Sequence, residues 1–195
     1  MAITYPLTLP AAFKTTEVEF TPRTVVGIHR DVFTGQSQTF VWPGQWWEFS
    51  MTVPPRVGAD ADACEAFLLS LNGVQGSFYF GDPARPTTLG TVAGTVQVGA
   101  GAVGNSTTLP LQGGTGTFAV GDWIQVGTRL HRIVKVNGST SVDIFPRLRS
   151  NYAQGTNVIY TNPVGIFQLA SNDVMKWSRN MLRHGLVTLS GIEKT

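Results

Sequence analysis

The sequence predicts a mainly β protein: a β-sandwich or split-barrel core with one α-helix and an inserted small β-barrel-like domain. Short runs of alternating apolar and polar residues are separated by closely spaced turns, which is typical of sandwiches and barrels. The chain also has 22 glycines and 11 prolines among its 195 residues, a content that suits many short strands meeting at turns. A third observation is a change of composition at residue 84, where a Gly/Thr/Val-rich stretch begins.

This stretch ends near residue 162, so we expect two domains. Residues 1–83 plus 163–195 would form a core domain, and residues 84–162 an inserted domain. After an extended N-terminal segment, strands of the core domain are expected at Glu17–Phe20, Thr24–Arg30, Ser37–Trp42, Trp46–Val53, Gly76–Phe80 and Val164–Leu169. Strands of the insert are expected at Thr91–Val98, Thr107–Leu111, Trp123–Val126, Leu130–Val136 and Val142–Phe145. Prolines should interrupt the core strands at Pro22, at Pro43-Gly44 and at Pro54-Pro55.

The segment Trp46–Val53 shows the clearest strand pattern in the chain. Trp47, Phe49, Met51 and Val53 alternate with Glu48, Ser50 and Thr52, which predicts one buried and one polar face. Trp46 places a large ring on the polar face. We interpret this departure from the pattern as a sign that the polar face contacts a partner.

A helix is expected at about Ala59–Leu71, where an apolar stripe includes Ala63, Phe67 and Leu71, joined by Ala66 and Leu68. Asp60 and Asp62 lie near its start, where the helix dipole favours negative charge. Gly73 follows its end, at the usual place for a left-handed cap.

The C-terminal region admits two interpretations. Val174–Asn180 and Leu186–Ile192 are favoured as the strands of a hairpin. The alternative is a helix from Asn172 to Leu182, because Val174, Trp177 and Met181 also fit helical spacing.

Composition narrows the possible functions. Charged residues make up 13% of the chain, about half the globular average of roughly 25%, and the net charge is +2. Such a sparsely charged surface suits burial in protein contacts, and it does not indicate a nucleic-acid binder. One cysteine, Cys64, offers no internal disulfide. The N-terminus lacks a signal-peptide pattern and no apolar run is long enough to span a bilayer, so we expect folding in a cytosol and no membrane anchoring.

Catalytic and ligand-binding motifs are weak. Gly99–Gly104 spells GxGxxG, but a dinucleotide site needs a helix to begin there, and the following Asn-Ser-Thr-Thr-Leu-Pro favours a hairpin loop. Gly113–Gly116 lacks the GK[ST] of a P-loop. Cys64 is expected to be a buried core thiol. We expect no catalytic residues, no cofactor and no metal site.

The remaining candidates also have structural interpretations. His29, His131 and His184 lie far apart, each beside an arginine, which does not suit a metal site. Among the carboxylate pairs, Glu17/Glu19 lie on one strand face and Asp60/Asp62 at the helix start. The tryptophans allow either a sugar-stacking platform or protein-interface anchors, and we favour the latter. The candidate interface residues are Trp42, Trp46, Trp47 and Phe49.

Several stretches resemble the distal tail proteins of long-tailed bacteriophages and gene-transfer particles. They are YPLTLP at the N-terminus, residues 33–55, the helix and its exit at residues 63–83, residues 120–136, residues 144–149 and residues 163–173. Together they cover most of the chain in the expected order.

This resemblance implies a six-fold ring in the virion, at the phage tail tip, made in the cytoplasm of a bacterial host. The ring would be a homo-oligomer joining the tail tube protein to the baseplate hub protein. Tape-measure protein and DNA would pass through it without specific binding, and outward-facing inserts could attach tail fibres. Alternatives are another tail structural protein, such as a tube or hub component, or a carbohydrate-binding module.

Overall fold

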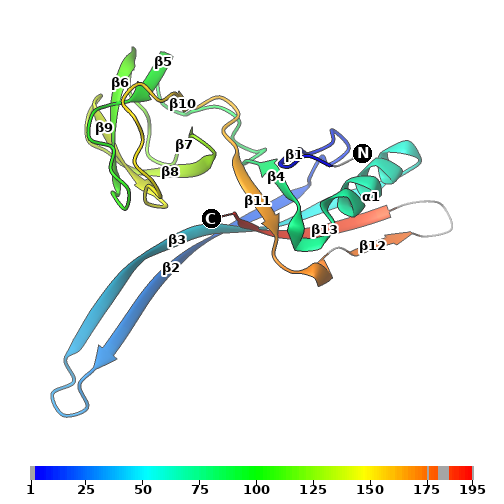
Figure 1. Cartoon of the computed structure of the whole chain (residues 1–195), viewed down its shortest axis with the longest axis horizontal. Coiled ribbons are helices and arrows are strands. Elements are labelled where there is room, and N and C mark those ends of the chain that lie inside the picture. The colour runs from blue at the N-terminus through cyan, green and yellow to red at the C-terminus, as the bar shows by residue number, and fades with distance from the viewer. Residues whose placement is uncertain (1–2, 175, 180–184, 195) are drawn as a thin grey trace.

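The protein, described by a computed structural model for residues 3–174, 176–179 and 185–194, is mainly β, as the sequence predicts (Figure 1). The described residues form two β-sheets and one α-helix, α1 (Ala59–Leu71). Figure 1 shows the two sheets as separate lobes, with a long hairpin extending from the larger one.

The larger sheet has seven strands. Six follow the order β1-β4-β11-β13-β3-β2, and β12 pairs with β13. Their bounds are β1 (Leu7–Thr8), β2 (Glu17–Arg30), β3 (Ser37–Arg56), β4 (Ser77–Phe80), β11 (Gly165–Leu169), β12 (Lys176–Arg179) and β13 (Gly185–Glu193). Apart from the parallel β1–β4 pair, its pairings are antiparallel. Both flanks of the chain therefore contribute to this sheet.

The smaller sheet lies entirely within residues 84–162. Its six strands follow the order β10-β7-β8-β9-β6-β5. Their bounds are β5 (Ala93–Val98), β6 (Thr108–Thr115), β7 (Trp123–Val126), β8 (Arg129–Val136), β9 (Ser141–Phe145) and β10 (Val158–Ile159). β5 and β6 pair as an antiparallel hairpin, and Gly99–Gly104 lies in the loop between them. This GxGxxG is therefore followed by a strand and not by a helix. We refer to residues 84–162 as the insert.

Each sheet has its own hydrophobic core. The first core contains Trp47, Phe49, Met51 and Val53 from β3, and α1 packs against it. The alternation expected for Trp46–Val53 is therefore confirmed. A second core lies inside the insert. Trp123, Leu130 and Phe145 of the insert belong to the first core instead, so the two lobes share an apolar seam.

The prolines expected to interrupt strands do not do so. β2 runs through Pro22, and β3 runs through both Pro43-Gly44 and Pro54-Pro55. Pro22 is tolerated because β2 is the edge strand, where alternate backbone N–H groups face away from the ladder. The other two sites coincide with register shifts opposite Thr24/Val26 and Gly185/Val187, and bulges accommodate proline.

The helix has the expected bounds, Ala59–Leu71, but its buried stripe is shifted. Ala61, Cys64, Phe67, Leu68 and Leu71 are buried, whereas Ala66 is exposed. The left-handed cap residue is Asn72, with φ 50° and ψ 52°, and its amide donates to the Leu69 carbonyl. Asparagine tolerates this conformation better than most residues. Gly73 is also left-handed, with φ 69°, as expected for the glycine just past the end of the helix.

The C-terminal strands form the favoured hairpin. β12 pairs antiparallel with β13, from Lys176↔Thr188 to Arg179↔Gly185. The helical alternative is wrong for the described residues, where a 3-10 turn at Asn172–Val174 is followed by β12. Arg183 and His184, which lie between the two expected strands, are outside the described residues.

Two phenylalanines of adjoining segments allow a matched test of the core. Phe49 is 2% exposed and Phe33 is 98% exposed. We expect Phe49→Ala to lower the free energy of unfolding by about 3–5 kcal/mol, since it leaves a cavity among packed rings. Phe33→Ala should stay within about 0.5 kcal/mol of the wild-type protein. Chemical denaturation measures both, and similar losses in the two variants would contradict this core assignment.

Candidate functional site: an exposed two-stranded arm

The most distinctive surface is the distal part of the β2–β3 hairpin, residues 24–42, which we call the arm. Its strands pair from Val26↔Val41 to Arg30↔Ser37. At about 3.4 Å per residue, the stretch from Thr24 to Arg30 extends roughly 20 Å. Figure 1 shows the arm leaving the body without a second layer on either side. Nearly every arm residue is accordingly exposed.

Apolar side chains occupy both faces of the arm. The pairing register places Val26, Ile28 and Val41 on one face, each at least 46% exposed. Phe40 and Trp42 lie on the other face, at 46% and 51% exposure. The Trp42 ring covers Gly27, where an added Cβ would lie 2.9 Å from the ring. The arm thus offers two apolar faces and, by itself, buries neither of them.

The tip of the arm is an ordered turn. Asp31 Oδ1 accepts hydrogen bonds from the amides of Phe33 at 2.7 Å and Thr34 at 3.2 Å. These bonds lower the pKa of Asp31 below its ordinary value, because they favour the charged carboxylate. Gly35 closes the turn at φ 70°, and its amide donates to the Asp31 carbonyl at 3.0 Å. This fixed turn presents Val32 and Phe33, which are 92% and 98% exposed.

The insert holds the root of the arm. The Oε1 atom of Gln45 accepts a hydrogen bond from the Arg147 amide at 2.9 Å, and its carbonyl accepts one from Arg149 Nη2. Trp47, two residues further along β3, packs edge-on against Trp123 and Phe145, each with a ring centroid 5.0 Å away. These contacts fix the base of the arm, at Gln45 and Trp47, to the insert as well as to the lobe from which it extends.

A buried carboxylate strengthens the same seam. Glu193 Oε2 accepts from the Trp47 amide at 3.3 Å, and its Oε1 lies 3.8 Å from Arg129 Nη1. Burial raises the pKa of Glu193, and the neighbouring Arg129 guanidinium opposes that rise. Arg129 also donates to the Lys194 carbonyl, so β8 is joined to the end of β13.

The four candidate interface residues fall in different environments. Trp47 and Phe49 are 4% and 2% exposed, so they pack in the chain's own core and are not available as surface anchors. Trp46 is half-buried, and its indole donates to Glu48 at 3.1 Å. Trp42 remains exposed on the arm. The three tryptophans therefore form no common sugar-stacking platform.

Sequence reasoning missed the apolar residues nearest the tip, above all Val32 and Phe33. It identified both arm strands, but as separate short strands of the core domain. A usable signal was present: Thr24–Arg30 and Ser37–Trp42 carry apolar residues at both odd and even positions while flanking a turn. Such a pattern on a two-stranded ribbon leaves apolar groups exposed whichever face is covered.

The histidines and the cysteine have structural environments where they are described. His131 is buried, and its Nδ1 lies 2.8 Å from the Pro146 carbonyl. Burial lowers the pKa of His131 to about 4, so the ring is neutral at pH 7. Burial also raises the pKa of the Cys64 thiol. His29 is exposed on the arm, and among the residues the structure describes no cluster of His, Cys, Asp or Glu could hold a metal ion.

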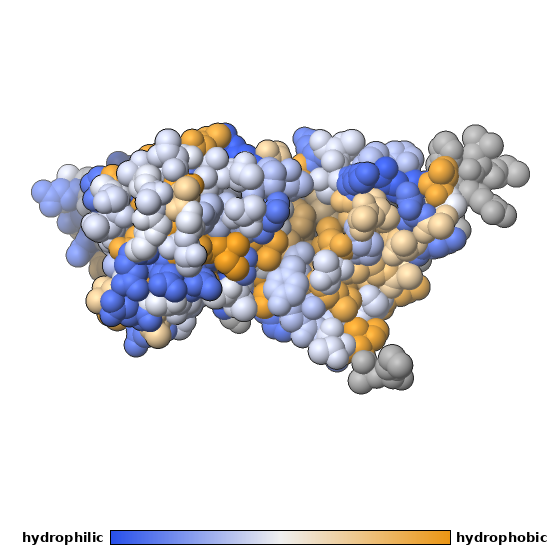
Figure 2. All heavy atoms as spheres, turned by 90° about the horizontal axis from the view of Figure 1, so that it is seen from above, coloured by the Kyte–Doolittle hydropathy of each residue, from blue (hydrophilic) through white to orange (hydrophobic). Residues whose placement is uncertain are grey.

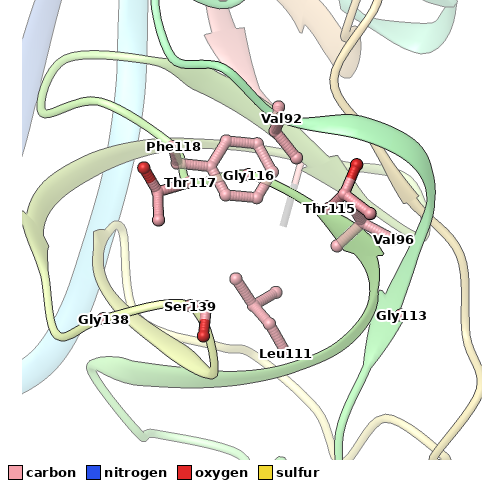
Figure 3. A pocket seen from close by; sticks show the side chains of 10 residues that line it. All are labelled: Val92, Val96, Leu111, Gly113, Thr115, Gly116, Thr117, Phe118, Gly138 and Ser139. Carbon is pink, nitrogen blue, oxygen red and sulfur yellow. The ribbon is translucent and has the colours of Figure 1, made fainter.

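The cavity inside the insert is too small for an organic ligand. It has a volume of about 10 Å³, close to that of a single water site. Figure 3 shows Phe118, Leu111, Val92 and Val96 around it, with hydroxyls of Thr115, Thr117 and Ser139 nearby. Larger grooves lie where the insert joins the first lobe, and one of them is apolar. None of the described helices is long and apolar enough to cross a membrane.

No protein-family model matches this sequence, and no curated protein matches it.

The buried His131 predicts a pH dependence. Its pKa is about 4 in the folded chain against an ordinary 6.5, so the unfolded chain binds more protons between these values. Above pH 6.5 this group does not reduce the free energy of unfolding. As the pH drops from 6.5 to 4, it lowers the free energy of unfolding by roughly 3 kcal/mol. His131→Asn keeps a donor for the Pro146 carbonyl but does not titrate there. We expect denaturation series to show a shallower loss of stability for this variant between pH 6.5 and 4.

His29→Asn is the matched control, because His29 is exposed on the arm. It should keep the wild-type slope. Equal slopes for His131→Asn and the wild type would show that His131 does not titrate as proposed.

Proposed function

We propose that this chain is a non-catalytic structural subunit that assembles with copies of itself into a ring through its arm. The carrying observation is an exposed two-stranded ribbon that is apolar on both faces. An isolated two-stranded hairpin is at best marginally stable in water, since it has no core of its own. Residues such as Ile28, Phe40 and Trp42 would gain burial against a neighbouring molecule.

A head-to-tail contact accounts for the shape of the subunit. The arm projects from one side of the molecule, so it reaches a different surface on the next copy (Figure 1). Repeated contacts of this heterologous kind close into rings when the rotation between subunits permits. The hydrogen bonds from Arg147 and Arg149 to Gln45 support this assignment, because they fix the direction of the arm. An arm with a fixed direction sets one angle between neighbouring subunits.

Within this proposal the ring is the distal tail ring of a long-tailed phage or gene-transfer particle. Its partners are the tail tube protein on one side and the baseplate hub protein on the other, with tape-measure protein and DNA passing through. The resemblance in the sequence supports this finer assignment. A net charge of +2 is consistent with a conduit, because dense phosphate contacts would hold DNA in place.

Shortening the arm tests the assembly. Because Val26 pairs with Val41, residues 27–40 can be replaced by an Asn-Gly turn that keeps this pairing. In dilute samples, below the concentration at which the wild type assembles, we expect the shortened protein to melt near the wild-type temperature, since the removed residues contribute nothing to either core. Sedimentation velocity should show the wild type as a ring and the shortened chain as a monomer. A wild-type chain that remains monomeric at every concentration would refute the ring.

A milder variant tests the apolar faces. Ile28→Ser with Val41→Ser removes two exposed apolar side chains from one face of the arm. We expect association to weaken by at least tenfold, because each of these contacts contributes about 1 kcal/mol or more. Leu89→Ser with Val120→Ser is the matched control on the exposed surface of the insert, and it should assemble as the wild type does. Equal effects of the two pairs would argue against the arm as the contact.

A further inference from the structure

We propose that the tip of the arm, with Phe33 as its anchor, inserts into an apolar groove of the next copy at the junction between β4 and the insert. This inference rests on the proposed ring and identifies the two surfaces that meet in it. Three features support it. The turn at the tip is ordered and presents an aromatic ring, and the groove is of side-chain size. The tip and the groove also lie far apart within one molecule.

The tip resembles an interface hot spot before any contact forms. Phe33 is 98% exposed although its backbone is fixed by the Asp31 carboxylate. A rigid loop loses little conformational entropy when it binds, so the burial of its aromatic ring is retained as affinity. Asp31 turns its charge toward the loop amides, which leaves Arg30 as the cationic side chain beside the tip.

The groove has an apolar lining and a volume of about 280 Å³. Its lining includes Leu9, Phe13, Tyr79, Phe80, Pro83 and Val164, with Thr8 and Thr15. Leu9, Tyr79 and Val164 are only half-buried, so the chain's own packing leaves them incomplete. The volume is at the lower end of the usual range for small-molecule sites, about 300–1,000 Å³, and has room for an aromatic side chain with one neighbour.

The surroundings of the groove match the tip. The groove continues along Gly81, Pro83 and Val164 into a second hollow of about 210 Å³ that Asp82 lines. The Asp82 carboxylate accepts hydrogen bonds from the Ala84 amide and from Trp123 Nε1, each at 2.9 Å, and its negative charge at this end of the groove would attract Arg30. In the view from above, hydrophobic residues border the notch between the two lobes (Figure 2).

A second copy of the chain is the occupant that fits these constraints. Figure 1 places the arm tip and the β1–β4 edge far apart, so one molecule cannot fill its own groove. Fully buried aromatic side chains contribute about 150–250 Å² each, so Phe33 with the half-exposed Phe40 and Trp42 supplies roughly 400 Å². This is about half of what one partner buries in a standard interface, before any other arm residue is counted.

Pairwise cross-linking tests the contact. One preparation carries Val32→Cys at the tip, which leaves the anchor Phe33 in place, and a second carries Thr8→Cys at the exposed rim of the groove. The native Cys64 is buried and stays in place. The two are mixed and treated with a short bis-maleimide. We expect cross-linked dimers in the mixture, and none when Val32→Cys is mixed with the control Val120→Cys, which is exposed on the insert.

Phe33→Ser provides the affinity measurement. Loss of a hot-spot aromatic should weaken association by about thirtyfold, while the melting temperature of dilute, unassembled protein is unchanged. The control Val120→Ser should leave association as in the wild type.

The outcomes separate the two proposals. If the wild type forms rings but Val32→Cys cross-links no better to Thr8→Cys than to Val120→Cys, the tip–groove contact is wrong and the ring stands. Cross-linking of Val32→Cys with itself would replace the head-to-tail contact with a tip-to-tip one. If the wild type is monomeric at every concentration, both proposals fail.

Discussion

The packing of Trp47 is the interaction on which the rest of the structure depends. Its ring lies where the larger sheet, the root of the arm and the insert meet, in contact with Phe20, Trp123 and Phe145. The amide of the same residue is held by Glu193 from the last strand. One side chain thus belongs to the core of the first lobe, to the seam with the insert and to the base of the arm. Disturbing it would loosen all three together.

The arm contrasts with this anchored base. A protein that keeps apolar side chains on both faces of a thin ribbon accepts a risk of aggregation, and such edges are usually short, charged or covered. Here the ribbon is long and sparsely charged, while Pro22 interrupts the backbone donors of β2 nearer the body. Proline thus discourages the addition of a further strand to the exposed edge of the sheet near the body. The exposed apolar side chains are instead concentrated on the projecting arm. In the proposed ring, this distribution would favour a specific docked state over indiscriminate strand addition.

The sequence predicted the local structure better than the tertiary contacts. Strict alternation located the buried face of β3, and the helix bounds followed from an apolar stripe and its end signals. The predicted interruptions at the prolines were wrong, because proline breaks a strand only where the ladder needs the missing N–H as a donor. Edge position and bulges decide whether it does. The candidate interface failed at Trp47 and Phe49 for a related reason. A tryptophan looks the same in sequence whether it anchors a partner or the chain's own core, and only the insert's Trp123 and Phe145 reveal which.

The insert joins the larger sheet at a place where it could be exchanged for another module. The insert leaves after β4 and returns at β11, two antiparallel neighbours that pair from Phe80↔Gly165. Topologically it takes the place of a hairpin turn, the position where one module is most easily exchanged for another. Gly165 packs so closely that an added Cβ would lie 2.9 Å from Leu130 of the insert. A replacement module would therefore fit only if it brought an apolar base of matching shape, whereas its outer surface makes no contact at this joint.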